Sequence, residues 1–144
     1  MIKKKVTKIL VPLDGSANSG RGLEMAISMA RQFGATITGV YSISLPVHSE
    51  FRGIGSVGES LNKEIKKIME GSKLLAAQNG IVFKEKIMRG DPGYNIIKLA
   101  HNKKDKFDLI VIGSRGRGSI KEMFFGSVSN YVIHCSKIPV LIVK

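Results

Sequence analysis

Glycine and serine residues form a spaced set near the end of the chain. Gly113 and Gly116 are followed, after the nine residues Arg117 to Phe125, by Gly126-Ser127. Glycines let backbone N–H groups approach phosphate oxygens closely. A helix that opens at Gly126-Ser127 adds unpaired N–H groups and a favourable dipole. The spacing therefore favours a phosphate site over a set of flexible turns.

Further polar residues are expected around this set. Asp14 ends the apolar run at the start of the chain and is followed by Gly15-Ser16. It is interpreted either as a ligand contact or as a turn or helix-capping residue, and its place at a strand end favours ligand contact. Arg115, Arg117 and Lys121 add positive charge beside the glycines.

Two other glycine patterns are weaker. The segment Gly53 to Gly58 has the spacing of a dinucleotide fingerprint, but it follows a second strand, and no acidic residue ends a strand about 20 residues later. We interpret it as a flexible loop. Gly113 and Gly118-Ser119 approach the phosphate loop of Walker-type enzymes but lack its lysine, so the pattern does not predict such an enzyme.

The remaining reactive side chains indicate no catalytic or metal centre. The histidines lie far apart, without metal-ligand spacing, and surface or capping roles are expected for His48, His101 and His134. The single cysteine, Cys135, excludes an internal disulfide and a multi-cysteine zinc site, and it is expected to be a buried small hydrophobic residue. For Phe124 and Phe125, core packing is favoured over base stacking.

Short apolar runs predict five strands, which must position these residues. Most are rich in β-branched residues and bounded by turn residues, as buried parallel strands are. The third has charged residues among its apolar ones, which is typical of an edge strand. The predicted strands are Ile9–Val11, Thr36–Tyr41, Ile81–Ile87, Leu109–Ile112 and Val140–Val143.

Helical periodicity separates these runs. One apolar stripe runs from Leu23 to Phe33 and is closed by Gly34, and a longer one runs from Val57 to Leu75. A third helix opens with Asp91 as N-cap and Pro92 at its first position, and a fourth spans about 127 to 135. Strands that alternate with helices predict a parallel α/β sheet covered on both faces. Residues 44–57 form the single long loop of this prediction.

Length and charge bound the class of protein. The 144 residues, with 43% hydrophobic and 24% charged, are expected to form one domain over residues 1–144. No apolar stretch reaches the length of a membrane span or resembles a signal peptide, so a soluble cytoplasmic protein is expected. The net charge of +12 suits anionic partners such as nucleotides or nucleic acid. No nucleic-acid-binding motif is present, so a nucleic-acid-associated protein is the least favoured of the functions considered.

The chain resembles the universal stress protein family. Its opening, Pro12-x-Asp14-Gly15-Ser16, and its close, the Gly-x2-Gly-x9-Gly-Ser run with Pro139 and the strand after it, carry the resemblance over essentially the whole chain. The resemblance implies a five-stranded Rossmann-like sheet in the order 3-2-1-4-5, and membership of the branch that binds ATP. One departure is Gly22, where the family usually has alanine. Glycine there is expected to soften the first helix by roughly 1 kcal/mol and to leave the site alone.

The resemblance also implies a role for each residue of the nucleotide site. Pro12 and Val40 would line the adenine pocket, and Asp14 would lie near the ribose or the metal-bound phosphates. Contact with the ribose is implied for Ile112 and Gly113. Phosphate binding, through backbone amides and one hydroxyl, is implied for Gly116, Gly126, Ser127 and Val128.

These observations together predict an ATP-binding regulatory module of the stress response. Mg²⁺ or Mn²⁺ would be held through the phosphates, and no residue is identified that orients water for hydrolysis. A slow ATPase that uses the same site is the alternative. Because Val140–Val143 would be an uncharged apolar edge strand, a homodimer through this strand is expected, as is common in the family.

Overall fold

The computed structural model describes residues 4–44, 55–117 and 125–144, and these form a three-layer α/β fold. The elements follow one another as β1 (Lys8–Pro12), α1 (Ala17–Phe33), β2 (Thr36–Ile43), α2 (Gly55–Gln78), β3 (Phe83–Arg89), α3 (Pro92–Ala100), β4 (Leu109–Gly113), α4 (Ser127–Cys135) and β5 (Val140–Val143). All neighbouring strands are parallel, in the order β3-β2-β1-β4-β5. The predicted class, strand order and alternation are confirmed.

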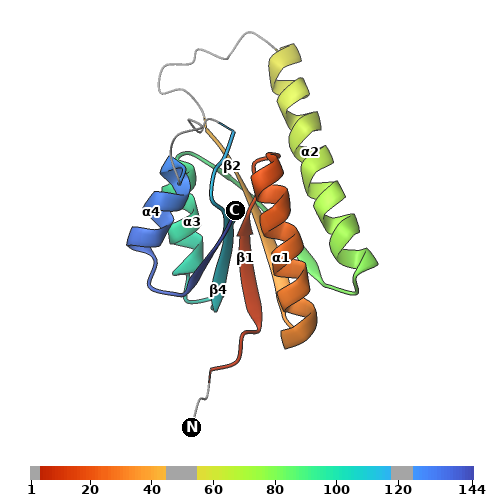
Figure 1. Cartoon of the computed structure of the whole chain (residues 1–144). Helices are drawn as coiled ribbons and strands as arrows, with labels where there is room; N and C mark the ends of the chain where they lie inside the picture. Colours follow the sequence, from red (N-terminus) through yellow and green to blue (C-terminus); the bar gives the residue numbers. More distant parts are fainter. Residues whose placement is uncertain (1–3, 45–54, 118–124) are drawn as a thin grey trace.

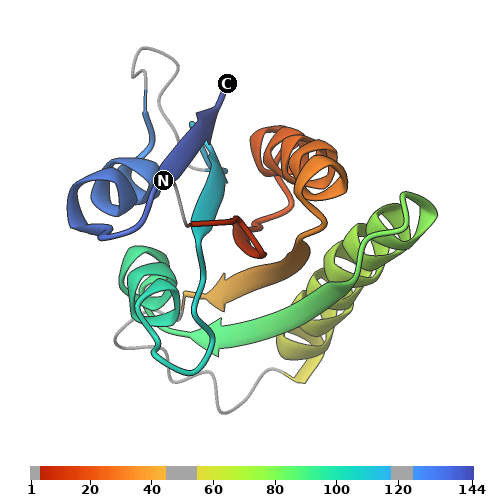
Figure 2. The same ribbon diagram turned by 90° about the horizontal axis from the view of Figure 1, so that it is seen from below.

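The sheet separates two hydrophobic cores. Helices α1 and α2 cover one face, and α3 and α4 cover the other (Figures 1 and 2). Successive side chains of a strand point to opposite faces, so Ile9 and Val11 join the α1–α2 core, while Leu10 between them joins the α3–α4 core. On β2 the same alternation turns Tyr41 to the first core and Val40 to the second.

Local signals in the sequence fix the ends of several helices. The Ser16 hydroxyl accepts a hydrogen bond from the Ser19 amide at 3.1 Å and caps α1, which ends at Gly34 with φ of 67°. Such a left-handed conformation favours glycine. Asp91 caps α3 by accepting from the Tyr94 amide at 2.8 Å. Gly34 and Asp91 were both predicted in these roles.

The β2–β3 pair differs from the prediction at its boundaries. Strand β3 begins two residues after the predicted Ile81, because the Ile81 amide donates to the Ala76 carbonyl and closes the end of α2. Strand β2 runs two residues past Tyr41, because Ser42 and Ile43 remain paired with β3. Side chains alone do not reveal such backbone pairing, which depends on the neighbouring strand.

The predicted loop over residues 44–57 is wrong at its end. Helix α2 begins at Gly55, so the second half of the Gly53–Gly58 pattern is helical rather than a flexible loop. Residues 45–54, which include His48, lie outside the described residues. The first two residues of the pattern, Gly53 and Ile54, lie in this range as well.

Helix α1 and strand β4 approach each other closely. A Cβ on Gly22 would lie 3.2 Å from the backbone nitrogen of Gly113, and a Cβ on Gly113 would lie 2.7 Å from the backbone of Asn18. Few real side-chain carbons are packed so tightly. Gly22 was predicted to soften α1 and leave the site alone, but it packs directly on the glycine that ends β4.

Helix α4 and strand β5 differ in how they agree with the predictions. Cys135 is exposed, not buried as predicted, because burial on α4 stops at Val132 and the cysteine is the last residue of the helix. All four residues of β5 are only partly buried, as expected for an edge. Within the described ranges, no helix is both long and apolar enough to cross a membrane.

Candidate functional site

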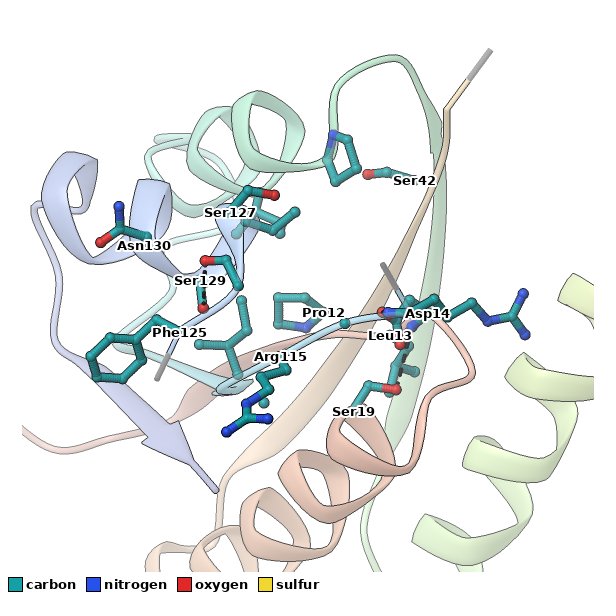
Figure 3. A pocket seen from close by; sticks show the side chains of 18 of the residues that line it. Pro12, Leu13, Asp14, Ser19, Ser42, Arg115, Phe125, Ser127, Ser129 and Asn130 are labelled. Carbon is teal, nitrogen blue, oxygen red and sulfur yellow. Dashed lines mark hydrogen bonds between the residues drawn. The ribbon is translucent and has the colours of Figure 1, made fainter. Parts of the chain in front are cut away.

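A cavity of about 770 Å³ opens at the carboxyl ends of β1, β2 and β4, beside the first residues of α3 and α4 (Figure 3). In parallel α/β sheets, ligands bind at this edge, where the strand order reverses. All the residues predicted for the site from the sequence line this cavity: Pro12, Asp14, Val40, Ile112, Gly113, Gly116, Gly126, Ser127 and Val128. The fold thus brings the predicted residues together, and their contacts with a ligand stay a prediction.

Asp14 connects the first loop to the glycine loop. One carboxylate oxygen accepts from the Ser16 amide at 2.8 Å, and the other accepts from the Arg117 amide at 3.2 Å. The two interpretations of Asp14 are therefore compatible, because it forms a turn and also lines the cavity. A Cβ on Gly116 would lie 2.6 Å from the second oxygen. A side chain at position 116 would therefore have to displace the Asp14 carboxylate.

Gly126 has a different role from the one predicted. Its amide was expected to bind phosphate, but it donates to the Ser114 carbonyl at 2.7 Å. The Ser129 hydroxyl donates to the same carbonyl at 2.8 Å and ties the start of α4 to the end of β4. A Cβ on Gly126 would lie 3.4 Å from Arg115 Cα, on the side of the glycine loop. The Gly126 amide is therefore already used within the protein, and a Cβ at this position would be in ordinary contact with the glycine loop.

The start of α4 presents a positive helix end to the cavity. Gly126 is the N-cap residue, and it makes no side-chain capping hydrogen bond because it has no side chain. The exposed Ser127 and the partly buried Val128 follow it and line the cavity. The amides of a first helical turn have no partner within the helix, and together with the dipole they attract anions. This end of the cavity suits phosphate or carboxylate.

Both arginines of the glycine loop line the cavity, and Figure 3 labels Arg115. The guanidinium of Arg117 also forms an ion pair with Glu64 of α2, and hydrogen bonding to Glu64 raises the Arg117 pKa above its ordinary value. The positive charge predicted for Arg117 is therefore at the cavity and is shared with Glu64. Lys121 lies outside the described residues.

Apolar side chains form part of the cavity wall. They include Val40 and Ile112 from the strands and Pro92 and Ile96 from the start of α3. Ile96 is 2% exposed. Such a surface suits an aromatic ring system, since apolar area removed from water provides most of the affinity of small ligands.

Several lining residues were missed in the sequence. Ser42 stands two residues after Val40 on the same side of β2, so its position could have been found from the strand period. Phe125 was expected to pack in the core, but it is 38% exposed and lines the cavity, because it precedes the N-cap at the cavity mouth. The residues missed are Leu13, Ser19, Ser42, Ser44, Pro92, Ile96, Phe125, Ser129 and Asn130. Phe124 lies outside the described residues.

The described histidines agree with capping and surface roles. His101 is the C-cap residue of α3, and its Nε2 accepts a hydrogen bond from the Lys137 amide at 2.9 Å. His134 is exposed in the last turn of α4. Among residues 4–44, 55–117 and 125–144, no group of three or more histidine, cysteine or acidic side chains is arranged to hold a metal ion.

Comparison with known proteins gives a consistent result. The model of the universal stress protein family matches residues 5–144. Universal stress protein YxiE of Bacillus subtilis is 36% identical over 147 aligned residues, which cover 95% of this chain and 98% of that protein. Universal stress protein UspA from Lactobacillus plantarum has a TM-score of 0.87 at 24% identity, covering 99% of this chain and 100% of that one, and shows the fold. A universal stress protein solved in complex with cAMP has a TM-score of 0.73 at 26% identity, covering 96% of this chain and 97% of that one.

Proposed function

Since the chain belongs to the universal stress protein family, we propose that its cavity binds ATP and that the protein acts as a nucleotide-responsive regulatory module. The single observation that carries the proposal is the lining of the cavity. Apolar side chains form part of its wall, and a glycine loop and a helix N-terminus form another part. A base with a phosphate tail has an apolar part and an anionic part to match them. The related protein solved with cAMP supports an adenine nucleotide as the ligand.

A divalent ion fits this site only as part of the ligand. Asp14 is the one acidic side chain among the described residues that line the cavity, and both of its oxygens already accept backbone hydrogen bonds. Mg²⁺ usually keeps several waters and binds through one or two carboxylates plus substrate phosphates. Phosphate oxygens would therefore hold the ion, with Asp14 beside it, and the ion would neutralise phosphate charge.

Mass spectrometry of ligand released from the purified protein tests the proposal. We expect ATP or ADP, and calorimetry with Mg²⁺-ATP should give one site per chain. A protein that releases no nucleotide and takes up neither ATP nor ADP at millimolar concentration would contradict the proposal.

Slow hydrolysis at the same site is the alternative function, and single-turnover kinetics at full ATP occupancy separates the two. No water-orienting residue is identified among the described lining residues, so we expect no rate above that of ATP in buffer. A measurable rate that falls in the Asp14→Ala variant would establish the ATPase. A rate that Asp14→Ala leaves unchanged would remove it.

The proposal includes a homodimer through β5. The outer edge of this strand is apolar and only partly buried, whereas the opposite edge strand, β3, has the exposed side chains of Lys84, Glu85 and Lys86. A second β5, antiparallel across a two-fold axis, would cover the edge. Light scattering should give a dimer for the wild type and a monomer or aggregate for Leu141→Lys. A β3 variant, Lys84→Ala, should stay dimeric, and a wild-type monomer at micromolar concentration would exclude the dimer.

A further inference from the structure

Ser42 and Asn95 form a polar pair where β2 and α3 meet beside the cavity. Ser42 lies near the end of β2, on the side that faces α3, and it lines the cavity (Figure 3). Asn95 lies on α3 behind it, with only 5% of its surface exposed. The Asn95 side-chain nitrogen lies 3.3 Å from the Ser42 hydroxyl oxygen and 3.0 Å from the Arg89 carbonyl oxygen.

The Arg89 carbonyl fixes the direction of these hydrogen bonds. A carbonyl oxygen can only accept, so the atom of Asn95 that faces it must be the NH₂ group. The same NH₂ group faces Ser42, whose hydroxyl oxygen therefore accepts from Asn95. The two protons of the amide are then both used, one on Arg89 and one on Ser42.

This arrangement leaves the Ser42 hydroxyl as a donor. A serine hydroxyl carries one proton, and Asn95 has no acceptor at the atom that it turns to Ser42. The proton is therefore directed away from Asn95, while the oxygen faces the cavity (Figure 3). Because Asn95 is buried on a helix, the hydroxyl is held in place before any ligand arrives.

We propose that Ser42, positioned by Asn95, donates a hydrogen bond to a ring nitrogen of the adenine base and so contributes to recognition of the base. The inference rests on the proposed function, because it places the base against the part of the cavity wall that Val40, Ile96 and Pro92 form. A ring nitrogen accepts such a bond, whereas a C–H group at the same place leaves a hydroxyl without a partner. One neutral hydrogen bond of this kind changes affinity by a few-fold to about tenfold.

Deaza analogues of ATP test the assignment, because each replaces one ring nitrogen by C–H. We expect the wild type to bind one of 1-deaza-, 3-deaza- and 7-deaza-ATP about fivefold more weakly than ATP. In Ser42→Ala this difference should shrink to less than twofold. Ser28→Ala, a change on the exposed surface of α1, is the matched control and should keep the wild-type difference.

An isosteric pair of variants separates the hydroxyl from the packing. Ser42→Thr and Ser42→Val have the same shape, but only the threonine has the hydroxyl. The threonine variant should keep the discrimination against the deaza analogue, and the valine variant should lose it. Asn95→Ala should reduce the discrimination, because the hydroxyl is then free to turn.

Two results overturn the inference. Binding of all three analogues by the wild type within twofold of ATP would show that no ring nitrogen is recognised. Discrimination that persists in both Ser42→Ala and Ser42→Val would assign it to another residue. In either case ATP still binds and the proposed function stands. A wild type that binds no adenine nucleotide would instead remove the proposed function and this inference together.

Discussion

At the amino ends of β1 and β4, side chains tie the connecting segments to one another, whereas at the carboxyl ends the loops leave a cavity. The Asp108 carboxylate accepts from the Thr7 amide at 2.8 Å, from the Thr7 hydroxyl at 2.9 Å and from the Lys8 amide at 3.1 Å. The Lys8 ammonium donates to the Asp105 carbonyl at 2.9 Å. At the other end, the comparable carboxylate is Asp14, which binds two loop amides beside the open space.

This difference follows from the polarity of the sheet. Helices in parallel α/β folds run back from the carboxyl to the amino ends of the strands, so their positive N-termini gather at the cavity end. The negative C-termini gather at the other end, where cationic side chains are favourable. The amino end is therefore suited to stability and the carboxyl end to anion binding.

The largest effect is expected where the cavity end is tightly packed. Gly113→Ala places a Cβ 2.7 Å from the backbone of Asn18, which cannot yield as a flexible side chain would. We expect the free energy of unfolding to fall by about 2–3 kcal/mol, the upper part of the range for overpacking. Urea denaturation measures it. Gly20→Ala, in open space on α1, should instead stabilise by about 0.5–1 kcal/mol.

A smaller effect is expected for Gly126→Val, which should weaken phosphate binding and leave binding of the base unchanged. Gly126 has φ of −73°, which any residue adopts, so Gly126→Val should fold. Its branched side chain should crowd the glycine loop and weaken ATP binding at least tenfold, about 1.4 kcal/mol. Adenosine has no phosphates, and calorimetry should find its affinity unchanged. Equal loss for both ligands would contradict the assignment of this end to phosphate.

At the amino end, Asp108→Ala should reduce stability without changing nucleotide affinity. Three hydrogen bonds are lost, on a partly exposed group, and we expect a cost of about 1 kcal/mol. Asp105→Ala keeps the carbonyl that binds Lys8 and is the control. A weaker ATP affinity in a folded Asp108→Ala variant would mean that the two ends are not separate in function.

The Asp108 carboxyl should also make the stability of the protein depend on pH. Burial alone would raise the pKa of Asp108, but the hydrogen bonds from Thr7 and Lys8, with Lys4 nearby, hold it below the ordinary value of 3.8. The unfolded chain therefore takes up this proton at a higher pH than the folded chain does. The contribution of Asp108 is full above pH 3.8 and is lost as the pH falls towards its folded pKa. The stability difference between wild type and Asp108→Ala should narrow over that range.

The smallest effect is expected for Ser127→Ala. The change removes one hydroxyl, while the first amides of α4 and the helix dipole remain. ATP affinity should fall two- to fivefold and adenosine affinity should stay the same, which titration of both ligands measures. A loss larger than that of Gly126→Val would assign the phosphate contact to the hydroxyl rather than to the backbone.

The elements, the caps Gly34 and Asp91 and the edge of the sheet at which the site lies could be predicted from the sequence. Apolar runs and periodic stripes record burial, and residues such as Gly34 and Asp91 act on backbone within a few positions of themselves. Because these effects act over a few residues, a short stretch of sequence is enough to predict them. The resemblance carried by the glycine spacing supplied the strand order and the residues around the cavity.

Only the tertiary structure decided how distant residues act on one another. A side chain at Gly116 would have to displace the carboxylate of Asp14, about a hundred positions earlier in the chain. Arg117 pairs with Glu64 on α2, and Asn95 fixes the hydroxyl of Ser42. Each of these contacts depends on which loops and helices the folded sheet places side by side. Residue types and spacings along one chain do not specify that geometry.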